Sequence, residues 1–135
     1  MRKEEFVSYD LVIELQKIDF NEPCIAFYNG KFLEYKIQGG DICSPYLSTE
    51  NRGNCPNAPT FSQCFSWFRE KYSLIGNPNH YGGLKHPNMP CNYKISGNTS
   101  TGQPIIGQVY DNYEEAELEC LKELIKIVKN ENKKN

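Results

Sequence analysis

The sequence has no long apolar run and few arginines, and both absences limit what the protein can be. Nothing in its 135 residues approaches the roughly 18 consecutive apolar residues that a membrane span needs. The N-terminus lacks the apolar core of a signal peptide, so we expect a cytoplasmic protein that contacts no membrane. Arg2, Arg52 and Arg69 are its three arginines, and the net charge of −2 would attract no nucleic acid.

Motifs for cofactor or metal chemistry are also missing. No Gly-x-Gly-x-x-Gly and no phosphate-loop lysine occurs, so the sequence predicts no cofactor. None of the six cysteines belongs to a Cys-x-x-Cys or another local chelating pair. In the cytoplasm we expect all six to be reduced and free of metal. A zinc site built from His80, His86 and Cys91 is the alternative.

The composition indicates one globular domain. With 39% hydrophobic residues, the chain can form one core and bury roughly two thirds of its surface. We predict a single α+β domain over residues 1–135, with an antiparallel sheet of about four strands packed against two or three helices. Turn-forming residues predict long irregular loops at 38–59 and 75–92, and the tail at 130–135 is expected to fray.

The first helix has recognisable signals at both ends. Ser8 can cap its N-terminus, with Val7 and Val12 placed as a hydrophobic staple on either side of the cap. The helix should end near Asp19, because the segment Asn21-Glu22-Pro23 cannot continue it.

A β-hairpin should follow between Cys24 and Ile37. The pair Asn29-Gly30 suits a two-residue type I′ turn, in which both central residues need positive φ. This register predicts two cross-strand pairs, Phe27 with Phe32 and Ala26 with Leu33. Two further strands are predicted near Asn92–Ser96 and Ile105–Tyr110.

Two later helices should supply most of the core. Thr60 caps the first of them, and Asn112 with Glu115 forms a capping box at the start of the second. Each shows an apolar face at helical spacing. These faces are Phe61, Cys64, Phe65, Phe68 and Tyr72 in the first helix, and Tyr113, Ala116, Cys120, Leu121, Leu124, Ile127 and Val128 in the second.

One set of residues suits a small anionic ligand that carries a ring. Arg52 lies in a loop rich in glycine and asparagine, which can present several backbone N–H groups to an anion. Trp67 and Tyr81 could stack on a base, and His80 and Lys85 add polar or cationic groups. These five residues are the predicted ligand site, and ordinary surface residues are the simpler interpretation.

The sequence predicts no catalytic residue. A thiolate nucleophile needs a base nearby, which Cys43 or Cys55 with His80 or His86 could supply. No spacing in the sequence favours that pairing. A small enzyme with such a Cys/His site is therefore the alternative to a binding protein.

Several segments resemble small proteins of phages and prophages from Bacteroides-type gut bacteria. The segments are Asn21-Glu22-Pro23-Cys24, Ala58-Pro59-Thr60 with Trp67-Phe68-Arg69-Glu70-Lys71-Tyr72, and 112–122 running on to Ile127-Val128-Lys129. The shared residues are mostly helix caps and core positions, and they cover about half of the chain. The resemblance implies a scaffold and assigns no functional residue.

The phage setting implies a protein that acts by binding. We expect an accessory protein in the bacterial cytoplasm that antagonises host defence. It would sequester a nucleotide-like signal or block a host defence protein, and it could form a homo-oligomer. A structural phage protein that only oligomerises is the remaining interpretation.

Overall fold

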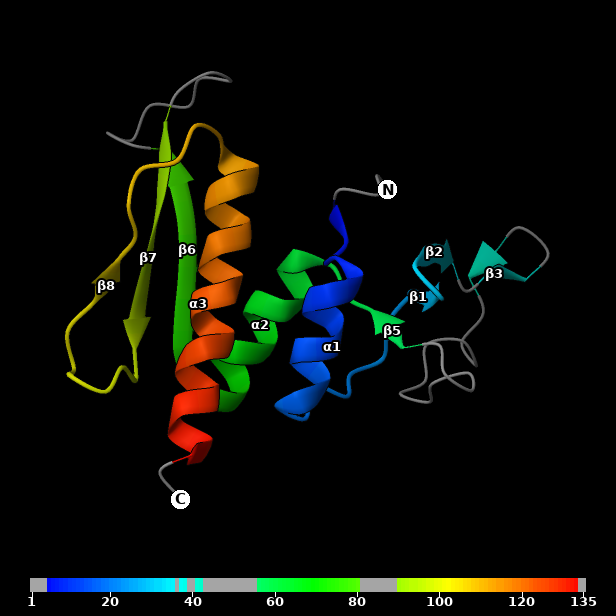
Figure 1. Ribbon diagram of the computed structural model, residues 1–135, viewed down its shortest axis with the longest axis horizontal. Helices are drawn as coiled ribbons and strands as arrows, with labels where there is room; N and C mark the ends of the chain where they lie inside the picture. Colours follow the sequence, from blue (N-terminus) through cyan, green and yellow to red (C-terminus); the bar gives the residue numbers. More distant parts are fainter. Residues whose placement is uncertain (1–4, 36, 39–40, 43–55, 81–89, 134–135) are drawn as a thin grey trace. The chain divides into compact units, whose positions relative to one another are not determined.

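The computed structural model describes residues 5–35, 37–38, 41–42, 56–80 and 90–133 (Figure 1). The chain forms two compact units, Met1–Phe61 (unit 1) and Ser62–Asn135 (unit 2). The described ranges contain three helices and two three-stranded antiparallel sheets, one sheet in each unit. The predicted α+β class is confirmed, and the strands expected in one sheet are divided between two.

Helix α1 of unit 1 spans Tyr9–Lys17. Ser8 has the extended backbone of an N-cap and its carbonyl accepts the Val12 N–H at 3.0 Å, but its hydroxyl makes no capping bond. Val7 and Val12 are both buried, in agreement with the predicted staple. The start of α1 is therefore held by main-chain bonding and apolar packing.

The hairpin forms, but the predicted turn and register are wrong. Strands β1 (Ala26–Asn29) and β2 (Phe32–Tyr35) pair with Asn29 opposite Phe32, so the loop is Gly30-Lys31 and not Asn29-Gly30. Gly30 has a φ of 63°, whereas the φ of Lys31 is not positive. A glycine at the first loop position followed by a residue with negative φ is typical of a type II′ turn.

The observed register also replaces the predicted cross-strand pairs. Phe27 lies opposite Glu34 rather than Phe32, and Ala26 lies opposite Tyr35 rather than Leu33. Because the shift is two residues, each side chain stays on its expected face of the strand. The side chain of Tyr28 is buried, and its hydroxyl donates to the Val7 carbonyl at 2.6 Å.

Three more short strands belong to unit 1. Strand β5 (Asn57–Ala58) pairs with β1 on the edge away from β2, giving the order β2-β1-β5. Strands β3 (Ile37–Gln38) and β4 (Asp41–Ile42) form a separate two-stranded ribbon. Within the predicted loop 38–59, residues 38, 41–42 and 57–58 are thus in strands, and residues 43–55 lie outside the described residues.

Unit 2 contains the sheet β6-β7-β8, with β6 at Leu74–His80, β7 at Cys91–Gly97 and β8 at Ile105–Ile106. The prediction of an irregular loop at 75–92 is wrong for 75–80 and 91–92. Two residues that usually mark turns, Gly76 and Pro78, lie inside β6. A Cβ on Gly76 would come within 2.9 Å of Leu124, so the glycine makes room for packing. Pro78 is in an edge strand, where a missing N–H is tolerated.

Helix α3 (Tyr113–Lys133) packs along β6 and β7, on one face of this sheet (Figure 1). Asn112 caps it as predicted, since its Oδ1 accepts the Glu115 N–H at 2.9 Å. Most of the predicted apolar face is buried: Ala116, Cys120, Leu121, Leu124 and Val128. Tyr113 is instead 38% exposed, and buried Ile125 was not predicted.

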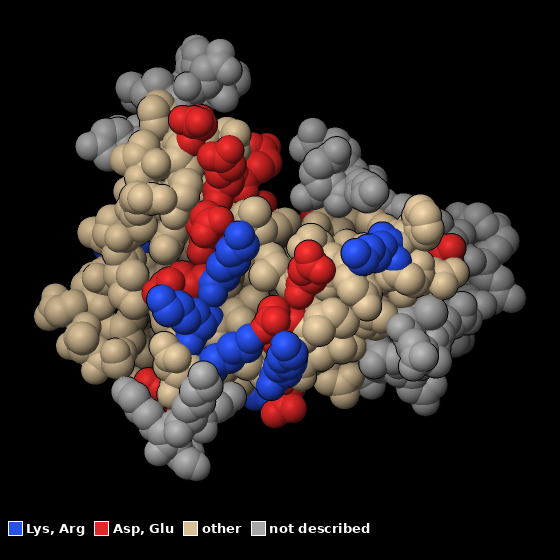
Figure 2. All heavy atoms as spheres, viewed as in Figure 1, with Lys and Arg blue, Asp and Glu red and all other residues tan. Residues whose placement is uncertain are grey.

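The charges of α3 follow the helix dipole. Acidic residues gather over its first half and basic residues over its second half (Figure 2). This arrangement is favourable because the helix N-terminus is positive and the C-terminus negative. The helix continues to Lys133, and the fraying expected at 130–135 stays a prediction.

Helix α2 spans Phe61–Tyr72. Phe61 and Phe68 are buried as predicted, whereas Phe65 is only partly buried. The Phe65 ring lies beside Gly76, where Leu124 and Cys120 also approach. This shared contact brings α2, β6 and α3 together in the core of unit 2.

Candidate functional site

The five residues of the predicted ligand site are not assembled by the described part of the chain. Arg52, Tyr81 and Lys85 lie outside the described residues. His80 is the last residue of β6, where its backbone pairs with Cys91. The nucleotide site therefore stays a prediction.

The fifth residue, Trp67, lies in the core of unit 2. Its side chain is 5% exposed, and its ring meets those of Phe68 and Tyr72 edge-on, at centroid distances of 5.0 and 5.4 Å. The Lys71 ammonium lies 5.2 Å from the same ring. A base could stack on Trp67 only after these neighbours move, so the structure offers no support for that role.

The Cys/His alternatives depend largely on residues outside the described ranges, namely Cys43, Cys55 and His86. Of the described cysteines, Cys91 and Cys120 are fully buried. Burial raises the pKa of Cys91, with a smaller contribution from Glu114, and burial raises the pKa of Cys120 to about 12. Both thiols are therefore poor sources of a thiolate. Among the described residues, no three His, Cys, Asp or Glu side chains are grouped to hold a metal ion.

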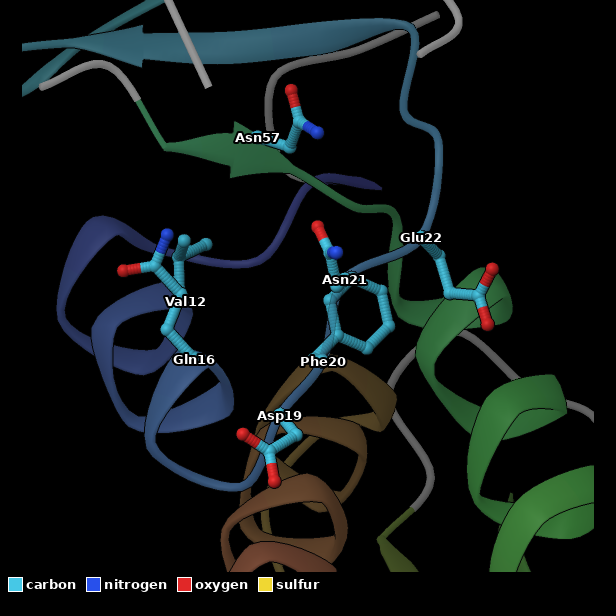
Figure 3. Close-up of a pocket in the computed structure, with 7 residues that line it drawn as sticks. All are labelled: Val12, Gln16, Asp19, Phe20, Asn21, Glu22 and Asn57. Atoms are coloured by element: carbon cyan, nitrogen blue, oxygen red, sulfur yellow. The ribbon is translucent and has the colours of Figure 1, made fainter. Parts of the chain in front are cut away.

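Unit 1 contains a cavity of about 500 Å³ (Figure 3). This volume is within the range of roughly 300–1,000 Å³ that is typical of small-molecule sites. Its lining comes from α1, from the segment that follows α1, and from β5. The lining residues are Val12, Gln16, Asp19, Phe20, Asn21, Glu22 and Asn57.

The end of α1 places the central lining residues. The Asp19 N–H donates to the Gln16 carbonyl at 3.1 Å, and the Phe20 N–H donates to the Leu15 carbonyl at 3.0 Å. With Asp19 at a φ of 68°, these bonds form a Schellman motif. The motif turns the chain sharply, so Phe20 is buried while Asp19 stays at the surface.

The cavity has a buried floor and a polar rim. Val12, Phe20 and Asn57 are each no more than 8% exposed and form the floor. Gln16, Asp19, Asn21 and Glu22 are exposed or partly exposed and form the rim. In Figure 3 the amides of Asn21 and Asn57 lie on the side of β5, and Val12 and Gln16 project from α1.

The rim is acidic. It includes the acidic residues Asp19 and Glu22, and none of the lining residues that the structure describes is basic. The nearest lysine in the sequence, Lys17, does not line the cavity and pairs with Glu14 at 3.2 Å. A ligand in this cavity would therefore meet negative charge and amide groups at the rim, above an apolar floor.

Among the described lining residues there is no serine, cysteine, lysine, histidine or tyrosine, and the two carboxyl groups of Asp19 and Glu22 are the groups that could carry a proton. Sequence reasoning missed this site because Asp19 and Asn21-Glu22 were interpreted only as the end of a helix. One signal in the sequence could have indicated the site: Asp19 is an acidic residue just after the helix, at a position that is commonly glycine and where the helix dipole disfavours negative charge.

The chain matches no protein-family model, no curated protein and no solved structure. Across the residues that the structure describes, no helix combines the length and apolar character that crossing a membrane requires.

Proposed function

We propose that this chain is a non-enzymatic binding protein that holds one small organic ligand in the cavity of unit 1. The observation that carries the proposal is the cavity itself, with its buried floor of Val12, Phe20 and Asn57 and its polar rim. A space of about 500 Å³ with groups for hydrogen bonding is typical of a binding site.

The biological role that we propose is antagonism of a bacterial defence by a phage or prophage accessory protein. Its support is the resemblance to such proteins at the helix caps and core positions. Sequestration of a signalling molecule needs a binding site but no catalysis, and the cavity supplies a candidate binding site. The nucleotide-like signal considered from the sequence would depend on Arg52 and Lys85, because the described residues of the cavity rim offer no cation to a phosphate group.

A thermal-shift screen tests the binding proposal. The compounds are nucleotide second messengers, NAD-derived molecules and small organic amines. A compound at 100 times its Kd should stabilise the protein by about 2.7 kcal/mol. Gln16→Trp should place a large side chain at the rim and abolish the shift. Lys17→Trp is the matched control, because Lys17 is an exposed neighbour that does not line the cavity.

Two results would overturn the proposal. One is that no compound stabilises the protein, and the other is that Gln16→Trp leaves every observed shift unchanged. Direct blocking of a host protein would then be the better proposal. The first residues to substitute in a test of that proposal would be Ile75 on β6 and Ile106 on β8, which are 44% and 66% exposed.

The biological role has a separate test. A bacterial strain that carries a defence system should regain sensitivity to phage when it expresses this protein. Expression of Gln16→Trp should fail to restore sensitivity, whereas Lys17→Trp should restore it. If both variants restore plaques equally, the cavity has no part in the biological role.

A further inference from the structure

We propose that the ligand of the unit 1 cavity is an organic cation, with an ammonium or guanidinium group on a short apolar chain. This inference rests on the proposed function and adds the chemical class of the ligand. It differs from the nucleotide-like ligand expected from the sequence, which would be an anion.

The polar part of the ligand follows from the charges at the rim. Asp19 and Glu22 lie on either side of Phe20-Asn21, and none of the described lining residues is basic. An ammonium or guanidinium group could donate a charge-assisted hydrogen bond to the Asp19 carboxylate, while the Glu22 side chain points away from Asp19 and adds negative charge near the rim (Figure 3). A phosphate or carboxylate would meet like charge there, and among the described rim residues the amides of Gln16 and Asn21 are the available donors.

The apolar part of the ligand follows from the floor. Val12 is 2% exposed and Phe20 is 8% exposed, so the inner part of the cavity presents an aliphatic and an aromatic side chain. A short methylene chain would fill the floor while its charged end stays at the rim.

An organic cation fits this lining better than a metal ion. Calcium and magnesium take six or more oxygen ligands in a compact shell. Within the described ranges, no group of three potential metal-binding side chains occurs, at the cavity or elsewhere. The cavity of about 500 Å³ is also far larger than a bare ion needs.

Four probes of matched size separate charge from apolar contact: n-butylammonium, n-butylguanidinium, n-butanol and butyrate. Each is titrated into ¹⁵N-labelled full-length protein, and the amide signals of residues 16–22 and 57 are followed by NMR. We expect both cations to bind at least about tenfold more tightly than butanol, as charge-assisted hydrogen bonds would give. Butyrate should bind more weakly than butanol.

Asp19→Asn is the decisive variant, since asparagine also tolerates the left-handed backbone at this position. It should remove most of the preference for the cations and leave butanol binding unchanged. Asp10→Asn is the matched control: Asp10 is an exposed acid in the first turn of α1 and does not line the cavity. It should keep the full preference.

The outcomes separate the two proposals. If butanol shifts the cavity signals and the cations bind no more tightly, the ligand class is wrong and the binding site stands. The ligand class is also wrong if Asp10→Asn and Asp19→Asn lose the preference equally. If none of the four probes shifts these signals, the small-ligand function is itself overturned.

Discussion

Unit 2 and unit 1 differ in how much room their described residues leave beside them. In unit 2 a methyl group on Gly107 would collide with the Tyr93 ring, and one on Gly76 would press on Leu124. Unit 1 instead has a cavity of about 500 Å³ that opens to the surface, with a floor of buried side chains and a rim of exposed or partly exposed residues. The difference indicates that these positions of unit 2 are filled for packing, while unit 1 leaves space at the place where we propose binding.

The helix ends show the same contrast. At the start of α3, Asn112 caps the helix and the acidic residues of the first turn suit the helix dipole. At the end of α1, Asp19 puts a negative charge where the dipole is also negative, and it has positive φ. Proteins often break such local rules at functional sites. The position of Asp19 at the cavity rim agrees with that pattern.

The largest effect is expected for Phe68→Ala, which would open a cavity in unit 2. Phe68 is fully buried, so the substitution should lower the free energy of unfolding by about 3–5 kcal/mol. Hydrogen exchange followed by mass spectrometry should show faster exchange in β6, β7 and α3. Full protection of these elements in Phe68→Ala would show that unit 2 is not closely packed around this residue.

Gly107→Ala tests the opposite change, the addition of a methyl group to the filled unit. The new Cβ would meet a rigid aromatic ring, and such overpacking typically costs about 1–3 kcal/mol. Gly76→Ala is the comparison, because its new Cβ would lie 2.9 Å from Leu124 and 3.1 Å from Cys120 and the Phe65 ring, farther than the Tyr93 ring would lie from a Cβ on Gly107. Urea unfolding should give a smaller loss for Gly76→Ala, and an equal or larger loss would contradict this account of the packing.

Alkaline pH should weaken unit 2 through Tyr93. Burial raises the pKa of Tyr93 from its ordinary value of 10 to about 12, and the charge of Glu123 adds to the shift. Because the folded-state pKa is the higher one, the contribution to stability is complete below pH 10 and is lost as the pH rises through about 12. At pH 11 the loss should be on the order of 1 kcal/mol. Tyr93→Phe should reduce this dependence in urea unfolding at pH 9 and pH 11, and an unchanged dependence would assign the effect to other groups.

The sequence predicted the parts of the fold that depend on local chemistry. The staple of Val7 and Val12, the Asn112 cap and most of the buried face of α3 follow from spacing along one helix and were found, although Tyr113 is exposed and buried Ile125 was not predicted. Strand β6 was missed because Gly76 and Pro78 are turn signals in isolation. The strand tolerates Gly76 because Leu124 packs close to it, and it tolerates Pro78 because β6 is an edge strand. Both conditions depend on tertiary structure, which the local sequence does not reveal.

The candidate site was harder to predict than the fold. Its floor joins Val12 and Phe20 with Asn57, which lies 37 residues beyond Phe20 in the sequence. No periodicity connects β5 with the end of α1. The chemistry expected from the sequence was carried by cationic and aromatic residues in or beside loops, whereas the cavity uses acids and amides from the end of α1 and from β5.

Asp19→Gly offers the smallest effect and the sharpest test of the contrast between the units. Glycine adopts positive φ without the steric cost of a Cβ, and the change removes a negative charge from the C-terminus of α1. If Asp19 serves ligand binding and not folding, Asp19→Gly should raise the free energy of unfolding by roughly 0.3–1 kcal/mol. The same variant should lose the preference for cationic probes. Asp19→Ala keeps a Cβ at positive φ and should gain less stability, which separates the backbone effect from the charge effect in urea unfolding. A destabilised Asp19→Gly protein would mean that the carboxylate holds the fold together, and the violation of local rules at this position would then have a structural cause.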